Sequence, residues 1–150
     1  MKNRKLISAC LLGVKCCYDG KSKPCPRAIN LFKQGRVIPV CPEQLGGLST
    51  PRIPSEIKGG NGDKVLRGKA RVISKKGIDV TENFAKGARE ALKIAKLFDV
   101  KEFIAKSKSP SCGLGKTYDG TFSNTLVRGD GVTVALFKKN RIKVKTENDL

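Results

Sequence analysis

The sequence predicts a single α/β domain over residues 1–150, with a mostly parallel sheet, flanking helices and a hairpin at one edge. Near the N-terminus, apolar segments of strand length alternate with a helix-like segment, the order expected of parallel strands joined by a crossover helix. A long amphipathic segment lies later in the chain. A chain of 150 residues is also long enough to bury one core without disulfides.

The N-terminal elements rest on local signals. Residues 5–9 and 36–40 are short apolar runs flanked by turn-forming residues, which predicts two buried strands. Residues 26–33 between them are expected to form a helix that Gly35 ends. The following residues 41–62 are rich in Pro and Gly, so we expect a long ordered loop, which in compact domains usually has a function.

A hairpin and a long helix are expected next. Residues 65–74 and 78–80 flank a Lys-Lys-Gly turn, which predicts a hairpin, and their charge places it at an edge of the sheet. Residues 81–98 carry apolar side chains at helical spacing, with Thr81 as the N-cap.

The C-terminal part is expected to complete the sheet. Residues 102–105 and 142–145 predict strands. Residues 131–137 are ambiguous, because their β-branched side chains favour a strand whereas the Asp before them and the Asn after them resemble helix caps. A helix is favoured there.

The composition excludes several classes of enzyme. The chain has no His, which rules out Ser-His-Asp and Cys-His nucleophiles and His-ligated zinc hydrolases. No apolar segment is long enough for a secretion signal or a membrane span, so we expect a cytoplasmic protein without membrane attachment. Thiols stay reduced in that compartment, and the six cysteines therefore indicate metal binding or catalysis rather than disulfides.

The net charge leaves two interpretations open. With 31 Lys and Arg against 13 Asp and Glu, the formal charge is +18, which indicates a phosphorylated or polyanionic partner. The same charge is typical of a Lys-rich solvated surface, and aromatic residues, at 5%, are few for stacking on single strands.

Three cysteines lie just beyond predicted strands. Cys10, Cys41 and Cys112 follow the strands at residues 5–9, 36–40 and 102–105. The C-terminal strand ends of an open α/β sheet line the crevice where ligands bind, so the three thiols are expected to converge. Three thiolates without His suit zinc or an iron–sulfur cluster. The alternative is that they pack as small buried hydrophobes.

Three motifs, in order, resemble those of the thiouracil desulfurase (TudS) family. They are Ser8-Ala-Cys-Leu-Leu-Gly13, then Cys41-Pro-Glu43 with Pro51-Arg-Ile-Pro-Ser-Glu56, then Lys108-Ser-Pro-Ser-Cys-Gly113. The resemblance runs from about residue 5 to residue 144. It implies a Rossmann-like α/β domain that carries a [4Fe-4S] cluster on Cys10, Cys41 and Cys112, with one iron left open.

The resemblance also implies an activity, the non-redox removal of sulfur from 2-thiouracil or 4-thiouridine monophosphate to give the oxo base and sulfide. An open iron is a soft Lewis acid for a thiocarbonyl sulfur, and water must then attack the ring carbon. Without His, Glu43 is the first candidate for the general base and Asp19 the second. Ser109 is expected to hold or protonate a ring nitrogen, and Arg52 and Ser111 to bind substrate.

Each of these residues has a structural alternative. Glu43 can simply pair with Arg52, which can instead be the partner of Glu56. Asp19 lies in a Tyr-Asp-Gly sequence typical of turns, and Ser109 before a proline can shape its loop.

Two other functions stay open. The first is the same chemistry on 4-thiouridine in tRNA, which the charge of +18 favours. The second is a non-enzymatic, basic RNA-binding module whose cysteines hold zinc or pack. The chain also carries Cys16, Cys17 and Cys25, and the family commonly has Arg at the position of Cys17. If one of these three closed the open iron, the site would be structural or electron-transferring.

Overall fold

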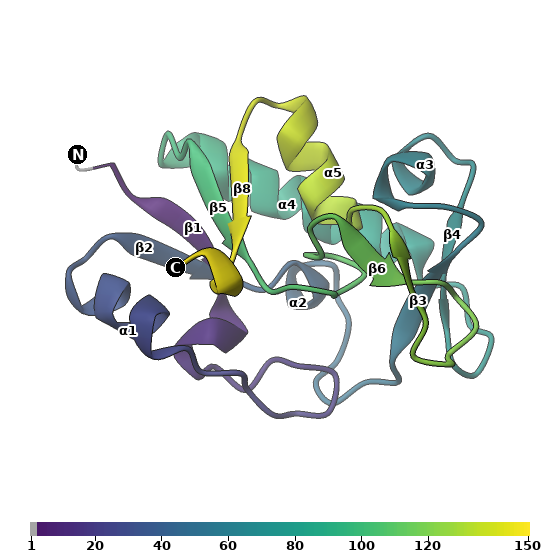
Figure 1. Ribbon diagram of the computed structural model, residues 1–150. Coiled ribbons are helices and arrows are strands. Elements are labelled where there is room, and N and C mark those ends of the chain that lie inside the picture. The colour runs from purple at the N-terminus through teal and green to yellow at the C-terminus, as the bar shows by residue number, and fades with distance from the viewer. Residues whose placement is uncertain (1–2) are drawn as a thin grey trace.

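The computed structural model describes residues 3–150 and has a parallel sheet at its centre (Figure 1). Its four strands are arranged in the order β2-β1-β5-β8. They are β1 (Lys5–Ser8), β2 (Val37–Val40), β5 (Glu102–Ala105) and β8 (Lys143–Thr146). Every neighbouring pair runs parallel, so the predicted strands and the α/β class are confirmed.

Helices cover both faces of this sheet. Successive residues of a strand point to opposite faces. In β1, Ile7 packs on the side of α1 (Pro26–Lys33), and Leu6 packs on the side of α4 (Thr81–Leu97) and α5 (Val132–Lys139). The ambiguous segment is therefore a helix, as favoured, and the predicted flanking helices are confirmed.

The Pro- and Gly-rich segment 41–62 contains more structure than a loop. It holds the short helix α2 (Pro42–Leu45) and the strand β3 (Ser55–Lys58). β3 pairs antiparallel with β4 (Arg71–Ser74) in a two-stranded sheet of its own. The expectation of a continuous loop was wrong, because tertiary contacts order two elements that are too short to give a sequence signal.

The predicted edge hairpin is confirmed in part. Residues 65–66 end the helix α3 (Gly62–Leu66) instead of starting a strand. The chain does turn back after β4, with the Ser74 N–H donating to the Ile78 carbonyl at 2.8 Å, the Val80 N–H donating to the Val72 carbonyl at 2.9 Å, and a bridge between Ile73 and Asp79. The predicted place at an edge of the main sheet was wrong, because β4 pairs along its whole length with β3. The resulting sheet stands apart from the central one.

A second antiparallel pair was not predicted. β6 (Lys116–Tyr118) and β7 (Leu126–Arg128) form another separate two-stranded sheet. Strands of three residues are below the length at which alternation is detectable, and an isolated hairpin of this size is only marginally stable without tertiary contacts.

The N-terminus of α4 differs by one residue from the prediction. Thr81 is the first helical residue, after Val80, and its hydroxyl accepts a hydrogen bond from the Val72 N–H at 2.9 Å. The capping group is instead the carboxylate of Asp79, which accepts the Thr81 N–H at 2.9 Å. Arg71 also donates to this carboxylate, from Nε at 2.8 Å.

Replacing Asp79 by Asn is expected to lower stability at neutral pH by about 1 kcal/mol or less, because the cap is partly exposed. Hydrogen bonds from Thr81 and then Arg71 lower the pKa of Asp79 to about 2, below the unfolded value of about 3.9. The stabilisation is therefore present above the unfolded pKa and is lost as pH falls through the folded one. Thermal unfolding should show a difference in Tm at pH 7 that shrinks toward pH 2.

The matched control is Asp99→Asn. Asp99 lies in an exposed ion pair with Lys101, so this substitution is expected to change Tm little. A difference between Asp79→Asn and the unchanged protein that did not depend on pH would contradict a capping carboxylate.

Two glycines bring α2 against α4. A Cβ on Gly46 would clash with the carbonyl oxygen of Asn83, and one on Gly87 would clash with the carbonyl oxygen of Pro42. Only residues without a side chain permit this spacing. As a result α2, which begins directly after Cys41, is held against a core helix.

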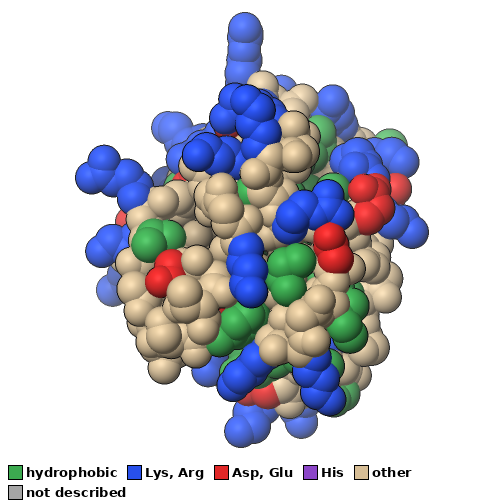
Figure 2. Space-filling model, turned by 90° about the vertical axis from the view of Figure 1, so that its right-hand side faces the viewer, with side chains coloured by type: hydrophobic (Ala, Val, Ile, Leu, Met, Phe, Trp, Pro, Cys, Tyr) green, Lys and Arg blue, Asp and Glu red, His purple; other side chains and the backbone are tan. Residues whose placement is uncertain are grey.

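The described surface is basic and mixed. On the face that Figure 2 shows, Lys and Arg side chains are spread among acidic, apolar and neutral ones rather than gathered in one patch. Some of the molecule's basic side chains are paired, as Lys138 is with Asp130 and Lys139 with Asp63. Among residues 3–150, no helix has the length and apolar character needed to cross a membrane.

Candidate active site

A cavity of about 520 Å³ opens where β1, β2 and β5 end. Its walls include the residues that directly follow each of these three strands. β1 lies between β2 and β5, so the chain passes from β1 to β2 on one side and later enters β5 on the other side. In open α/β sheets, ligands bind at such a switch point.

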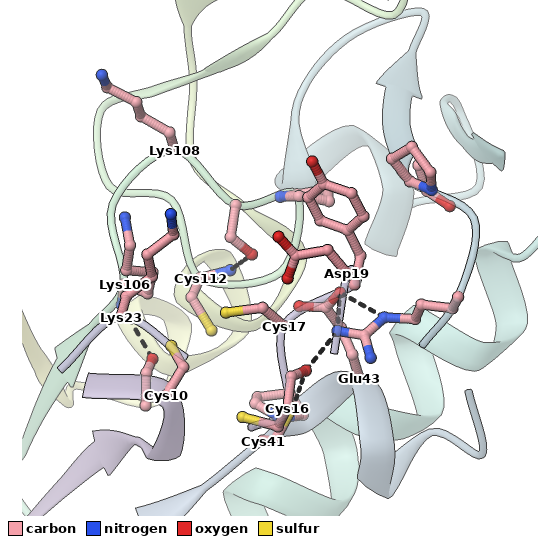
Figure 3. A pocket seen from close by; sticks show the side chains of 18 of the residues that line it. Cys10, Cys16, Cys17, Asp19, Lys23, Cys41, Glu43, Lys106, Lys108 and Cys112 are labelled. Carbon is pink, nitrogen blue, oxygen red and sulfur yellow. Dashed lines mark hydrogen bonds and ion pairs between the residues drawn. The ribbon is translucent and has the colours of Figure 1, made fainter. Parts of the chain in front are cut away.

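Five of the six cysteines line this cavity, namely Cys10, Cys16, Cys17, Cys41 and Cys112. Cys10 lies in the 3-10 turn Ala9–Leu12 after β1, Cys41 directly precedes α2, and Cys112 lies in the loop after β5 (Figure 3). The structure thus brings together the three cysteines that follow strands. Their role as ligands stays a prediction.

Cys16 lies beside Cys41. It is 2% exposed, and its carbonyl oxygen accepts a hydrogen bond from the Cys41 thiol at 3.9 Å. The neighbouring Cys10 side chain is the main reason why the pKa of Cys16 rises to about 12. The Cys16 side chain raises the pKa of Cys41, and burial raises that of Cys112 to about 12. Cys41 and Cys112 must lose their protons to bind a metal.

The chemistry of these side chains suits an iron–sulfur cluster. Several soft thiols share one cavity, and the chain has no His that would favour other metals. Within residues 3–150, no group of three or more Cys, His, Asp or Glu side chains stands at metal-binding geometry. The thiols of the cavity therefore suit an iron–sulfur cluster in their chemistry and in their place at the strand ends.

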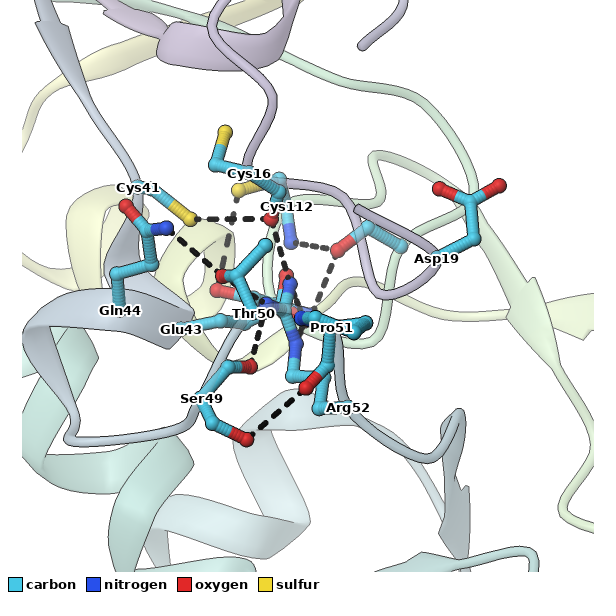
Figure 4. A network of polar contacts seen from close by, with 12 residues as sticks. Cys16, Asp19, Cys41, Glu43, Gln44, Ser49, Thr50, Pro51, Arg52 and Cys112 are labelled. Carbon is cyan, nitrogen blue, oxygen red and sulfur yellow. Dashed lines mark hydrogen bonds and ion pairs between the residues drawn. The ribbon is translucent and has the colours of Figure 1, made fainter. Parts of the chain in front are cut away.

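Glu43 is held by Arg52 next to these thiols. The Arg52 guanidinium donates to Glu43 Oε2 from Nη2 at 3.0 Å and from Nε at 3.3 Å (Figure 4). It also donates to the carbonyl oxygens of Cys16 and Ser49 and to the hydroxyl of Thr50. Both side chains are largely buried, at 8% exposure for Arg52 and 16% for Glu43. The partner of Arg52 is therefore Glu43 rather than Glu56.

The two predicted serines differ in their placement. Ser109 lines the cavity, and its hydroxyl oxygen accepts the N–H groups of Ser111 and Cys112, each at 3.0 Å. It thereby shapes the loop that carries Cys112. The structure does not bring Ser111 to the cavity wall, because its hydroxyl is buried against that of Thr133 at 2.8 Å. Its contact with substrate stays a prediction without structural support.

Charges of opposite sign flank the thiols. Glu43 and the exposed Asp19 lie on one side of them, and Lys23, Lys106 and Lys108 lie on the other (Figure 3). The carboxylate of Asp19 accepts the N–H of Lys21 at 3.0 Å, as expected of a turn residue. The cavity can thus hold a ligand whose one end is anionic.

Comparison with known proteins identifies the family. Residues 6–149 match the family described as 2-thiouracil desulfurase. The chain belongs to this family. It is 43% identical over 145 residues to the uncharacterized protein YbbK of Bacillus subtilis (strain 168), covering 97% of this chain and 96% of that protein.

A solved structure agrees. The [4Fe-4S]-dependent thiouracil desulfidase TudS is 37% identical in sequence and superposes with a TM-score of 0.87, over 99% of this chain and 93% of that one. The resemblance that the three sequence motifs carry to the 2-thiouracil desulfurase family is therefore confirmed.

Sequence reasoning missed several residues of the cavity wall. Lys106 directly follows β5 and Lys108 lies two residues further on, so the argument that identified Cys112 would also have found them. Glu56 lies in β3 and Phe122 lies in the turn between β6 and β7. Neither residue follows a strand of the parallel sheet, so this argument could not find them. Cys25 lies outside the cavity at the N-cap of α1, which leaves Cys16 and Cys17 as the additional thiols there.

Proposed function

We propose that this chain is a [4Fe-4S]-dependent desulfidase that acts on thiolated pyrimidines such as 2-thiouracil or 4-thiouridine monophosphate. The observation that carries the proposal is that Cys10, Cys41 and Cys112 line one cavity together with Glu43. Membership of the 2-thiouracil desulfurase family and the likeness to TudS support it. The reaction consumes water, converts C=S to C=O and releases hydrogen sulfide, with no net transfer of electrons.

Cys10, Cys41 and Cys112 would hold the cluster and leave one iron without a protein ligand. When bound, the cluster supplies a soft Lewis acid for the thiocarbonyl sulfur. The three cysteines lie in the segments that follow β1, β2 and β5. Hydrogen bonds hold two of these segments in place: Arg52 donates to the carbonyl oxygen of Cys16 in the segment after β1, and Ser109 accepts the N–H of Cys112 in the segment after β5.

Glu43 would take a proton from the water that attacks the ring carbon, and the same proton leaves with the released sulfide. Arg52 keeps the Glu43 carboxylate in place and links it to the carbonyl of Cys16, so the base has a fixed position relative to the thiols. Asp19 is the second candidate for the base. Ser109 would contact the ring nitrogen from the Cys112 loop.

The lysine side of the cavity favours a nucleotide over a free base. Lys106 pairs with Glu147 at 3.0 Å, whereas neither Lys23 nor Lys108 has an ion-pair partner in the part of the chain that the structure describes. A ring at the thiols would leave its phosphate near these lysines (Figure 3). The charge of +18 also favours the alternative substrate, 4-thiouridine in tRNA.

Iron and acid-labile sulfide, measured on protein prepared without oxygen, test the cofactor. We expect about four of each per chain and a brown solution. A colourless protein that held zinc or no metal after attempted reconstitution would contradict the proposal and favour structural cysteines.

Sulfide release from 2-thiouracil, 4-thiouridine monophosphate and thiolated tRNA tests the substrate. Faster turnover of the nucleotide than of the base supports the role of the lysines. Efficient turnover of tRNA that falls steeply with added salt would favour the alternative. Cluster-loaded protein that released sulfide from none of the three would contradict the function itself.

A further inference from the structure

The end of β6 and the turn that follows it form a wall of the cavity to which the proposed chemistry assigns no role. Tyr118, Phe122 and Asn124 of this segment line the cavity. We call residues 118–124 the recognition turn. Phe122 is only partly buried and belongs to none of the hydrophobic clusters formed by residues 3–150, so the core does not account for this aromatic ring.

Glu56 attaches the recognition turn to the rest of the molecule. Its Oε1 accepts the N–H of Gly120 at 2.9 Å and that of Phe122 at 3.1 Å. Glu56 is 9% exposed and has no ion-pair partner among the described residues, so these hydrogen bonds stabilise its buried charge. Gly120, at φ +94°, allows the close approach, since a Cβ there would lie 2.8 Å from the Ile57 carbonyl oxygen.

The turn is also braced internally. Asp119 Oδ1 accepts the N–H of Thr121 at 2.9 Å and its hydroxyl at 2.6 Å. The hydroxyl of Ser123 lies 2.6 Å from that of Thr121 and 2.9 Å from that of Thr125. A chain of hydrogen bonds therefore fixes the backbone on either side of Phe122.

Two residues of the turn have a left-handed backbone, Phe122 at φ 58° and Asn124 at φ 59°. This conformation is strained for a bulky residue and persists only where the surroundings enforce it. Phe122 and Asn124 both line the cavity, as Tyr118 does, whereas Thr121 and Ser123 do not. Asn tolerates the left-handed conformation, so the strain lies at Phe122 and coincides with the placement of its ring in the cavity wall.

We propose that the recognition turn selects the pyrimidine ring, with Phe122 against the face of the ring, Asn124 at its polar edge and Glu56 as the residue that positions the turn. An aromatic side chain stacks on any nucleobase ring. The amide of Asn124 offers both a donor and an acceptor, which match the N–H and C=O groups of a uracil edge. This inference rests on the proposed function.

The first test compares Phe122→Ala with Val127→Ala in cluster-loaded protein. Val127 is an exposed apolar residue of β7 outside the cavity. We expect Phe122→Ala to raise KM for 4-thiouridine monophosphate by roughly 5- to 100-fold, the range of a stacked base, with a much smaller change in kcat. Val127→Ala should leave both unchanged. An unchanged KM in Phe122→Ala overturns the proposal.

The second test concerns positioning. Glu56→Ala should raise KM as Phe122→Ala does, and Glu56→Gln should restore most of the affinity, because an amide oxygen can still accept both N–H groups. The double variant Glu56→Ala with Phe122→Ala should have no higher KM than Phe122→Ala alone. Additive effects would overturn the role of Glu56 in positioning this contact. If Glu56→Ala does not fold, Glu56→Gln and Phe122→Ala still decide.

Equilibrium dialysis with uracil separates this inference from the proposed function. The unchanged protein should bind uracil, and Phe122→Ala should bind it at least about fivefold more weakly. Binding that is lost in Phe122→Ala, in a protein that releases no sulfide, would support the turn and contradict the desulfidase. Sulfide release with equal uracil binding in both proteins would do the opposite.

Discussion

Replacing Cys10, Cys41 or Cys112 by Ala is expected to remove the cluster and to lower sulfide release by more than about 100-fold. Loss of a residue that merely orients a metal ligand already costs about 10- to 100-fold, and loss of a ligand should exceed this. Each of the three thiols lines the cavity from a different loop, so neither of the others can take its place without movement of the backbone. Iron content, the visible spectrum and sulfide release measure the outcome.

Cys25→Ala is the matched control, because Cys25 is partly buried like Cys41 but lies outside the cavity. It should keep both iron and activity. Cys16→Ala and Cys17→Ala are expected to keep the cluster too, and loss of iron in either would identify it as a ligand and argue against an open iron. A full complement of iron in Cys112→Ala would contradict the ligand set.

Replacing Glu43 by Gln is expected to keep the cluster and to lower kcat by about 100- to 10,000-fold, the range of a lost general base. Gln has nearly the shape of Glu and can still accept a hydrogen bond from Arg52, but it cannot take a proton from water. The visible spectrum and iron content should match those of the unchanged protein, while sulfide release under saturating substrate falls.

Glu82→Gln, on the exposed face of α4, controls for the substitution itself and should not change kcat. If Glu43→Gln were fully active, the structural alternative for Glu43, an ion pair with Arg52, would be its whole role. Asp19→Asn would then become the decisive variant, since Asp19 also lines the cavity.

The parallel sheet and the place of the three cysteines could be predicted because both depend on strong local signals. The apolar run that became β1 is buried on both faces, and buried strands of a parallel sheet give continuous apolar sequence. The edge strand β2 buries Val37 and Val40, and its sequence is apolar throughout. The rule that ligands bind at strand ends then led to Cys10, Cys41 and Cys112 without knowledge of the strand order.

The rest of the site depends on contacts between distant segments. The side chain of Glu56 accepts N–H groups 64 and 66 residues away, and no local pattern indicates such a contact. The four-residue helix α2 begins with Pro42, in a segment whose prolines and glycines suggest a loop. Gly46 permits close packing of α2 against α4, and this role can be recognised only in the structure that contains both helices.

Two walls of the cavity differ in how firmly the fold holds them, and the glycine contact between α2 and α4 is the reason. Cys41 and Glu43 stand at a short helix that cannot shift without displacing the 17-residue helix α4 from the core. The recognition turn is fixed mainly by its own hydrogen bonds and by one carboxylate. A library that seeks new ring preferences should therefore randomise Tyr118, Phe122 and Asn124 and leave Gly46, Gly87 and Gly120 unchanged.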